Sequence, residues 1–285
     1  MKITPISDVL GQVDLALPKL NALLPTVDNY KTILLQPKGE IEASKGGVRN
    51  RDRMLAANPY RSFLEIARQT EADLVITPEY SMPWEVLIGT LKEGRSPTVG
   101  KLWALGCESI TYTDLQKLRQ ELTESAEVLF EPQQAQEDRF VDPLAYIFLA
   151  PHAKDSSKYR LVILVQFKTH PMVDKEHFEV SRLQRGTCIY EFCGFQNGIP
   201  LPRIAVLIHG ITVQPQSQRE FCNTIPPTTE VTAHVGNRRS VPIAKFKRSS
   251  KVHYTLLTDA GSPLTRTRPQ PRPSRHPRPL LAPAD

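Results

Sequence analysis

The sequence has few cysteines and no long apolar run. Only 4 of the 285 residues are cysteine, which is too few for a domain held together by disulfide bonds. No stretch of about 18 consecutive apolar residues occurs, so no transmembrane helix is predicted. The opening segment MKITPISDVLGQVDLALPKL lacks the continuous apolar core of a secretory signal. We therefore expect a protein of the reducing cytoplasm that does not bind membranes.

The composition suits a globular protein, but the charge is unevenly distributed. Apolar residues make up 40% and charged residues 23% of the chain. Residues 1–210 hold 24 Lys and Arg against 26 Asp and Glu, whereas residues 211–285 hold 12 against 4. The Arg/Pro-rich end cannot bury enough apolar surface to offset its ordering entropy, so we expect 210–285 to be an irregular, disordered basic tail. The Arg/Pro stretch RTRPQPRPSRHPRP within it lacks interleaved aromatic residues, which predicts weak nucleic-acid binding at most.

Short apolar segments alternate with amphipathic ones along the first 209 residues, which favours an α/β fold. Strands are predicted at 30–36, 73–78, 101–110, 144–150, 159–167, 187–192 and 203–208. Helices are predicted at 9–17, 60–71 and 114–128, and polar loops at 39–59 and 131–141. We expect one domain over 30–209, preceded by a segment, 1–29, without an assigned role.

Three chemically useful side chains each follow a predicted strand. Glu79 follows DLVITP, Lys168 follows LVILVQF and His209 follows RIAVLI. The carboxyl ends of strands are where α/β sheets gather reactive groups from distant parts of the chain. A carboxylate and an ammonium in such positions predict a general base and a cation that stabilises developing negative charge.

These motifs resemble the nitrilase, or carbon–nitrogen hydrolase, superfamily. ADLVITPEY is similar to the family's strand that ends in Pro-Glu, and QFKTHP, followed by Glu176 and Leu183-x-x-Gly186, is similar to its Lys segment. GIPLPRIAVLI is similar to the strand that leads to the family's nucleophile, and YKTILLQ to its opening strand. The resemblance covers about residues 30–209, and the long interval between Glu79 and Lys168 suggests an insertion around 113–141.

The resemblance implies an α-β-β-α sandwich, commonly a homodimer, with no metal or organic cofactor. In that family a Cys thiolate attacks the carbon of a small non-peptide amide or nitrile. A Glu accepts the thiol proton, and a Lys holds the oxyanion. Carried over to this chain, Glu79 is the base, Lys168 the oxyanion group and Glu176 a second carboxylate.

The nucleophile position departs from the family pattern. His209 stands where the family has its Cys, and imidazole does not form the stable thioester that the mechanism needs. The composition changes at the same point. This coincidence suggests a change of reading frame at or just before His209, an incomplete C-terminal part and poor solubility. Cys188 or Cys193 could supply a relocated thiol, or Cys188 could be a core residue, and Trp84 could line a pocket beside Glu79 or pack in the core.

Three functions therefore remain open. The chain could be a hydrolase of the amidase or nitrilase type. It could be a non-catalytic relative, or pseudoenzyme, that binds a ligand or partner or is a truncated remnant. It could also be one module of a larger assembly, because nitrilase-like domains occur fused to other catalytic domains, including those of bacterial defence systems.

Overall fold

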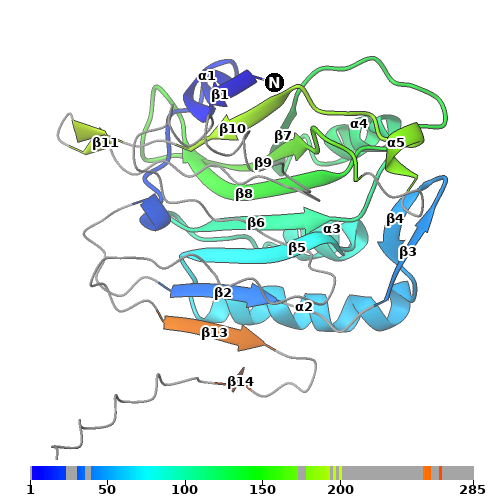
Figure 1. The fold of residues 1–285 in the computed structure, drawn as a ribbon. Coiled ribbons are helices and arrows are strands. Elements are labelled where there is room, and N and C mark those ends of the chain that lie inside the picture. Colours follow the sequence, from blue (N-terminus) through cyan, green and yellow to red (C-terminus); the bar gives the residue numbers. More distant parts are fainter. Residues whose placement is uncertain are drawn as a thin grey trace, which may run out of the picture.

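A computed structural model describes residues 2–23, 31–35, 40–172 and 178–192, with the backbone of four short strands further along the chain (Figure 1). Those strands are β11 (Phe195–Gln196), β12 (Ile199–Pro200), β13 (His253–Leu257) and β14 (Pro263–Leu264). The predicted strand 203–208 and His209 lie outside the described residues, as does most of 210–285. No helix in the described part is long and apolar enough to cross a membrane.

An eight-stranded mixed sheet organises the fold and confirms the predicted mixed α/β class. Its strand order is β14-β13-β2-β5-β6-β8-β9-β7. The strands between β13 and β7 in this order are β2 (Lys31–Leu35), β5 (Leu74–Met82), β6 (Leu102–Cys107), β8 (Pro143–Pro151) and β9 (Tyr159–Phe167). Strands β13, β2, β5 and β6 are parallel, and β8 is antiparallel to both of its neighbours.

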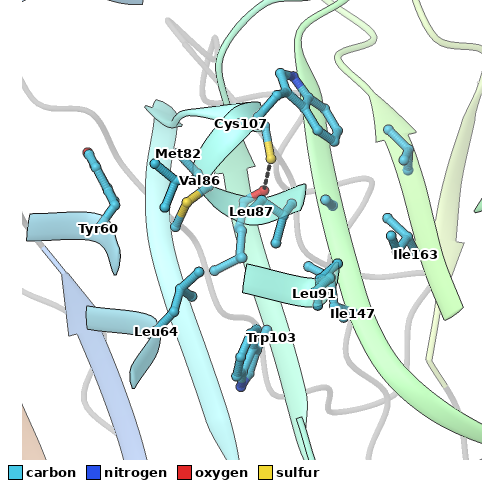
Figure 2. Close-up of a cluster of buried hydrophobic side chains, with 14 of the residues drawn as sticks. Tyr60, Leu64, Met82, Val86, Leu87, Leu91, Trp103, Cys107, Ile147 and Ile163 are labelled. Carbon is cyan, nitrogen blue, oxygen red and sulfur yellow. Dashed lines mark hydrogen bonds between the residues drawn. The ribbon is translucent and has the colours of Figure 1, made fainter. Parts of the chain in front are cut away.

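Helices cover one face of this sheet. They are α2 (Arg53–Gln69), α3 (Trp84–Lys92) and α4 (Tyr112–Glu121). Alternate residues of each strand, such as Trp103 and Cys107 of β6, point into the core beneath the helices, as strand periodicity requires (Figure 2). Each large apolar side chain buried there contributes about 1.5–3 kcal/mol to folding. Trp84 belongs to this core, and its indole N–H donates to the carbonyl of Glu108 at 2.9 Å, so the core alternative for Trp84 is the correct one.

The opposite face of the sheet packs against the N-terminal segment and a second, small sheet. Strand β1 (Lys2–Pro5) pairs in parallel with β10 (Cys188–Glu191). Helix α1 (Ile6–Gly11) and the 3-10 turn η1 (Asn21–Leu23) add apolar side chains to the same core. The segment 1–29 therefore has a packing role in its described part, and its helix is shorter and earlier than the 9–17 that we expected.

The predicted loop 39–59 is instead largely ordered secondary structure. Strands β3 (Ile41–Ser44) and β4 (Gly47–Asn50) form an antiparallel hairpin, and α2 then begins at Arg53 rather than at 60. The prediction was wrong because it rested on the polar, charged and glycine-containing composition of the segment, which a hairpin and the exposed first turns of a helix also show. Pro59 removes one backbone hydrogen bond and crowds the preceding turn, but the apolar face of α2 packs on the core on both sides of it and holds the helix together.

The cap of α2 gives a first test of this revised boundary. The Asp52 side chain accepts a hydrogen bond from the Leu55 backbone N–H at 2.9 Å. Replacing Asp52 with alanine should lower the free energy of unfolding by about 1 kcal/mol, because one N–H of the first turn loses its acceptor. Denaturant titration measures the change. Asp52→Asn keeps an acceptor oxygen and serves as the control, and an equal loss in both variants would contradict the capping role.

The segment 114–128, which was predicted as a single helix, is the end of one helix followed by the start of a strand. Helix α4 ends at Glu121, and β7 (Ala126–Phe130) pairs in parallel with β9 at the edge of the sheet. Val128 and Leu129 are buried on opposite faces of the sheet. Backbone pairing with β9 and burial on both faces of the sheet therefore outweigh the local helix propensity of residues 126–128.

Candidate functional site

Four strands bring acidic and basic residues to one edge of the sheet. Strands β5, β6 and β9 run in the same direction, so their carboxyl ends lie together, and the antiparallel β8 begins at that same edge. Glu79 lies near the end of β5, Lys168 directly follows β9, and Asp142 directly precedes β8. In Figure 1 this edge also carries α5 (Glu179–Arg182) and the β3–β4 hairpin.

A large bulge in β5 presents Glu79. Thr77 pairs with Leu105 and Met82 pairs with Cys107, so the four residues from Pro78 to Ser81 stand opposite Gly106 alone. The Ser81 hydroxyl donates to the Pro78 carbonyl at 2.6 Å and closes the bulge. Tyr80 has a φ of 61°, in the left-handed region that bulky residues rarely adopt. Bulges of this kind commonly redirect side chains next to functional sites.

Lys168 is the centre of the cluster and is only 1% exposed. Its Nζ lies 2.9 Å from Glu79 Oε1, 2.8 Å from Glu179 Oε2 and 2.5 Å from the Tyr80 hydroxyl. The backbone of Lys168 is fixed as well, since its N–H donates to the Asp142 carbonyl and its carbonyl accepts from the Gly186 N–H. The contact between Glu79 and Lys168 that the sequence predicted is present.

Gly186 shows why the Leu-x-x-Gly segment accompanies the lysine. A Cβ at position 186 would lie 2.5 Å from the carbonyl oxygen of Phe167 and 2.8 Å from Glu131 Oε1. Only glycine lets the backbone approach this closely. The motif thus holds the strand end that carries Lys168.

The second carboxylate on Lys168 comes from Glu179. Glu179 is fully buried in the short helix α5, and its Oε2 accepts the Met172 N–H at 2.6 Å. Sequence reasoning proposed Glu176, which lies outside the described residues. The sequence offers no periodic signal for Glu179, because α5 is only four residues long.

Asp142 supplies a third buried carboxyl group. It accepts a hydrogen bond from the Ser109 hydroxyl at 2.5 Å, and the Ser109 oxygen accepts from the Val48 N–H. Its other oxygen has no hydrogen-bond partner in the described part of the chain. Burial raises the pKa of Asp142 well above its usual value, and the charge of Glu179 adds to this effect.

Three carboxyl groups around one ammonium set the charge of the cluster. Burial raises the pKa of Glu79, and the Lys168 charge opposes that shift only in part. Burial alone would lower the pKa of Lys168, but Glu79, Glu179 and Asp142 outweigh it, so the pKa is raised and the side chain stays cationic. A carboxylate of raised pKa beside a permanent cation is suited to proton transfer and to stabilising an oxyanion.

The two described cysteines are placed away from this cluster. Cys107 lies in the core beneath the helices, where its Sγ contacts the Leu105 carbonyl (Figure 2). Cys188 lies in the core on the opposite face of the sheet, which agrees with its interpretation as a core residue. Burial raises the pKa of both thiols, that of Cys188 to about 11, so neither is a thiolate at neutral pH. Cys193 lies outside the described residues.

A surface cavity of about 410 Å³ lies near the same edge of the sheet. It is lined by residues of the β3–β4 turn, the start of α4, the loop before β8 and Arg182 of α5. Glu79, Lys168 and Glu179 do not line it, and within the described residues all three are buried. Comparison with protein-family models, with curated proteins and with solved structures finds no match for this chain.

Proposed function

We propose that residues 30–209 form a carbon–nitrogen hydrolase-type domain whose Glu79–Lys168 pair receives a small non-peptide amide or nitrile, and that His209 has replaced the thiol nucleophile. The observation that carries the proposal is the buried contact between Glu79 and Lys168 at the ends of β5 and β9, with Glu179 as a second carboxylate on the same ammonium. The order of these residues in the chain and their place at one sheet edge agree with the resemblance seen in the motifs.

In a site of this type the pair performs two tasks. Glu79 takes the proton of the thiol as its sulfur bonds to the amide carbon, and the carbonyl electron pair moves onto oxygen. Lys168 stabilises that oxyanion, and Glu79 returns the proton to the departing amine. Water then hydrolyses the thioester. With imidazole at position 209 the thioester step is lost, so the chain as it stands is proposed to bind such ligands without turning them over.

The finer fold belongs to the same proposal. Helices on one face, the main sheet and the β1–β10 sheet on the other face supply three of the four layers of an α-β-β-α sandwich. A homodimer, cytoplasmic location and independence of metals and organic cofactors are proposed from the resemblance. The buried free thiols of Cys107 and Cys188 are compatible with a reducing compartment.

A non-catalytic module is the second candidate, and one observation favours it. The Lys168 ammonium makes contacts with Glu79, Glu179 and Tyr80 and is shielded from solvent in the described part of the chain. A cluster that satisfies itself in this way can serve to fix the sheet edge rather than to bind a ligand.

Restoring the thiol tests the first candidate directly. In His209→Cys, we expect the introduced thiol to form covalent adducts with small aliphatic amides or nitriles, detected by intact-protein mass spectrometry. Adding Glu79→Gln should slow adduct formation by about 10²-fold, because the proton acceptor is lost.

Glu85→Gln is the control for that double variant, since Glu85 is a half-exposed carboxylate near the same edge that contacts Arg53 rather than Lys168. It should leave the rate unchanged. An introduced thiol that forms no adduct, or one whose rate is the same with Glu79→Gln, would exclude the hydrolase-type site and favour the non-catalytic module.

A further inference from the structure

Tyr80 shares the ammonium of Lys168 with the residue that precedes it. Consecutive residues of a regular strand point to opposite faces, so Glu79 and Tyr80 would be expected to diverge. Instead both reach Lys168 Nζ, at 2.9 Å and 2.5 Å. The left-handed backbone of Tyr80, with its φ of 61°, makes this possible within the bulge. Such strained conformations persist only where the surrounding structure holds them, and they cluster at functional sites.

The Tyr80 hydroxyl is fully used as a donor and an acceptor. It donates to Glu179 Oε1 and accepts from Lys168 Nζ, while the Tyr80 ring itself is only 1% exposed. A phenol that donates its proton must be neutral. Burial and the charges of Asp142, Glu79 and Glu179 raise its pKa far above the usual value, so this arrangement persists across the physiological range.

Three side chains share the N–H donors of the Lys168 ammonium, and the contact with Glu79 has the poorest hydrogen-bond geometry of the three. An ammonium has three N–H donors. Tyr80 accepts one and Glu179 accepts another. Glu79 Oε1 is close enough for an ion pair, yet it is a buried oxygen without a hydrogen bond of acceptable geometry in the described residues. The third N–H therefore lies on the Glu79 side of the ammonium, where it forms an ion pair of poor hydrogen-bond geometry, and it is the donor that an oxygen arriving beside Glu79 would meet.

We propose that Tyr80 is a positioning residue: with Glu179 it occupies two donors of the Lys168 ammonium and thereby orients the third toward the place where a substrate oxygen would lie next to Glu79. This inference rests on the proposed function for its substrate oxygen. The orientation of the ammonium is a property of the resting protein and can be tested by itself.

Tyr80→Phe removes the hydroxyl and keeps the ring. The ammonium protons of Lys168 should give a slowly exchanging signal in proton–nitrogen NMR of the protein with labelled lysine side chains, assigned by its loss in Lys168→Met. In Tyr80→Phe we expect exchange of these protons with water to speed up by about tenfold, because one charged hydrogen bond is lost. An unchanged exchange rate would overturn the proposal.

Tyr112→Phe is the matched control. Tyr112 is also buried, and its ring packs on Phe167 beside Lys168, but its hydroxyl accepts the Gln133 N–H at 2.9 Å rather than a Lys168 N–H. It should leave the Lys168 signal unaltered, whereas a general loosening of the core would change the signal in both variants. Should Tyr80→Phe fail to fold, replacing all tyrosines with 3-fluorotyrosine alters the acidity of the phenol while its shape stays nearly the same. The Lys168 nitrogen signal should then shift, and an unmoved signal counts against the proposal.

The functional arm uses the His209→Cys background. There Tyr80→Phe should reduce the maximal rate of adduct formation while half-saturation by the amide stays the same, since the oxyanion forms only after binding. If His209→Cys is inert but Tyr80→Phe still accelerates ammonium exchange, the hydrolase-type function fails and the orienting role stands. If adducts form and Tyr80→Phe changes neither readout, the orienting role fails alone.

Discussion

Replacing Lys168 with methionine will lower the free energy of unfolding by about 3–5 kcal/mol at about pH 8 and by clearly less at about pH 5. Lys168 is the cation shared by Glu79 and Glu179, and Asp142 interacts with it electrostatically. Without it, these buried carboxylates repel one another, and no other cation of the described residues forms an ion pair with Glu79 or Glu179. Methionine fills most of the volume, so the loss reports charge rather than a cavity.

The direction of the pH effect follows from the pKa shifts. The pKa values of Glu79 and Asp142 are raised in the folded protein, and losing Lys168 raises them further. The carboxyl groups have pKa values of about 4 in the unfolded chain and higher values in the folded variant. At any pH between these two limits the folded variant therefore binds more protons than the unfolded chain. Its stability therefore increases as the pH falls through that window. Urea titrations at the two pH values measure the difference.

Lys101→Met is the control, because the carboxylate that Lys101 contacts has a lowered pKa, whereas those of Glu79 and Asp142 are raised. Lys101 is 2.7 Å from Asp73, a carboxylate whose pKa is lowered because bonds from Lys101, the Lys31 N–H and Asn21 outweigh the effect of its burial. In Lys101→Met, Asp73 keeps the hydrogen bonds from the Lys31 N–H and Asn21, which still oppose the effect of burial on its pKa, so this penalty should depend far less on pH between about pH 5 and about pH 8. A Lys168→Met penalty that is equally independent of pH would contradict the charge balance described for the cluster.

Gly106→Ala is expected to cost about 1–3 kcal/mol and to displace Glu79. A Cβ on Gly106 would lie 2.2 Å from the Pro78 carbonyl oxygen and 2.8 Å from Glu79 Cα. Both are backbone atoms, which cannot rotate away, so the bulge must move. The Glu79–Lys168 contact moves with it. Denaturant titration and the ammonium NMR signal of Lys168 measure the two effects.

Gly89→Ala in α3 is the comparison for that variant. A Cβ at position 89 meets nothing within 4 Å, so alanine there should raise the free energy of unfolding by about 0.5–1 kcal/mol through its better helix propensity. Opposite signs at the two glycines are the expected result. If Gly106→Ala were as stable as the parent with an unchanged Lys168 signal, the close approach of β6 to the bulge would be refuted as the reason for glycine at position 106.

The strand-end residues could be predicted because a continuous apolar run shows in the sequence where a buried strand ends. DLVITP and LVILVQF are buried on both faces, and the residues that follow them fall at one sheet edge whatever the details of the loops. That reasoning was enough to place Glu79 beside Lys168. It needed only the parallel direction of β5 and β9, which the order of strands and helices favours.

Tyr80 and Glu179 could not be predicted in the same way. Strand periodicity assigns Tyr80 to the face opposite Glu79, and only the positive φ inside the bulge reverses this. Glu179 sits in a four-residue helix too short to leave a periodic pattern. Its role depends on tertiary contacts with Tyr80 and Lys168. The early start of α2 was missed for a related reason, since the packing that carries the helix past Pro59 is not visible in local sequence.

The pairing of β1 with β10 links residues near the start of the chain to the backbone that holds the buried Lys168. Lys2 through Pro5 are matched in parallel with Cys188 through Glu191, and β10 begins two residues after Gly186, whose N–H holds the Lys168 carbonyl. Strand β1 is thus connected to the end of β9 through β10 and Gly186, within a few peptide units. A substitution or label that weakens the β1–β10 pairing should therefore disturb the backbone that anchors Lys168.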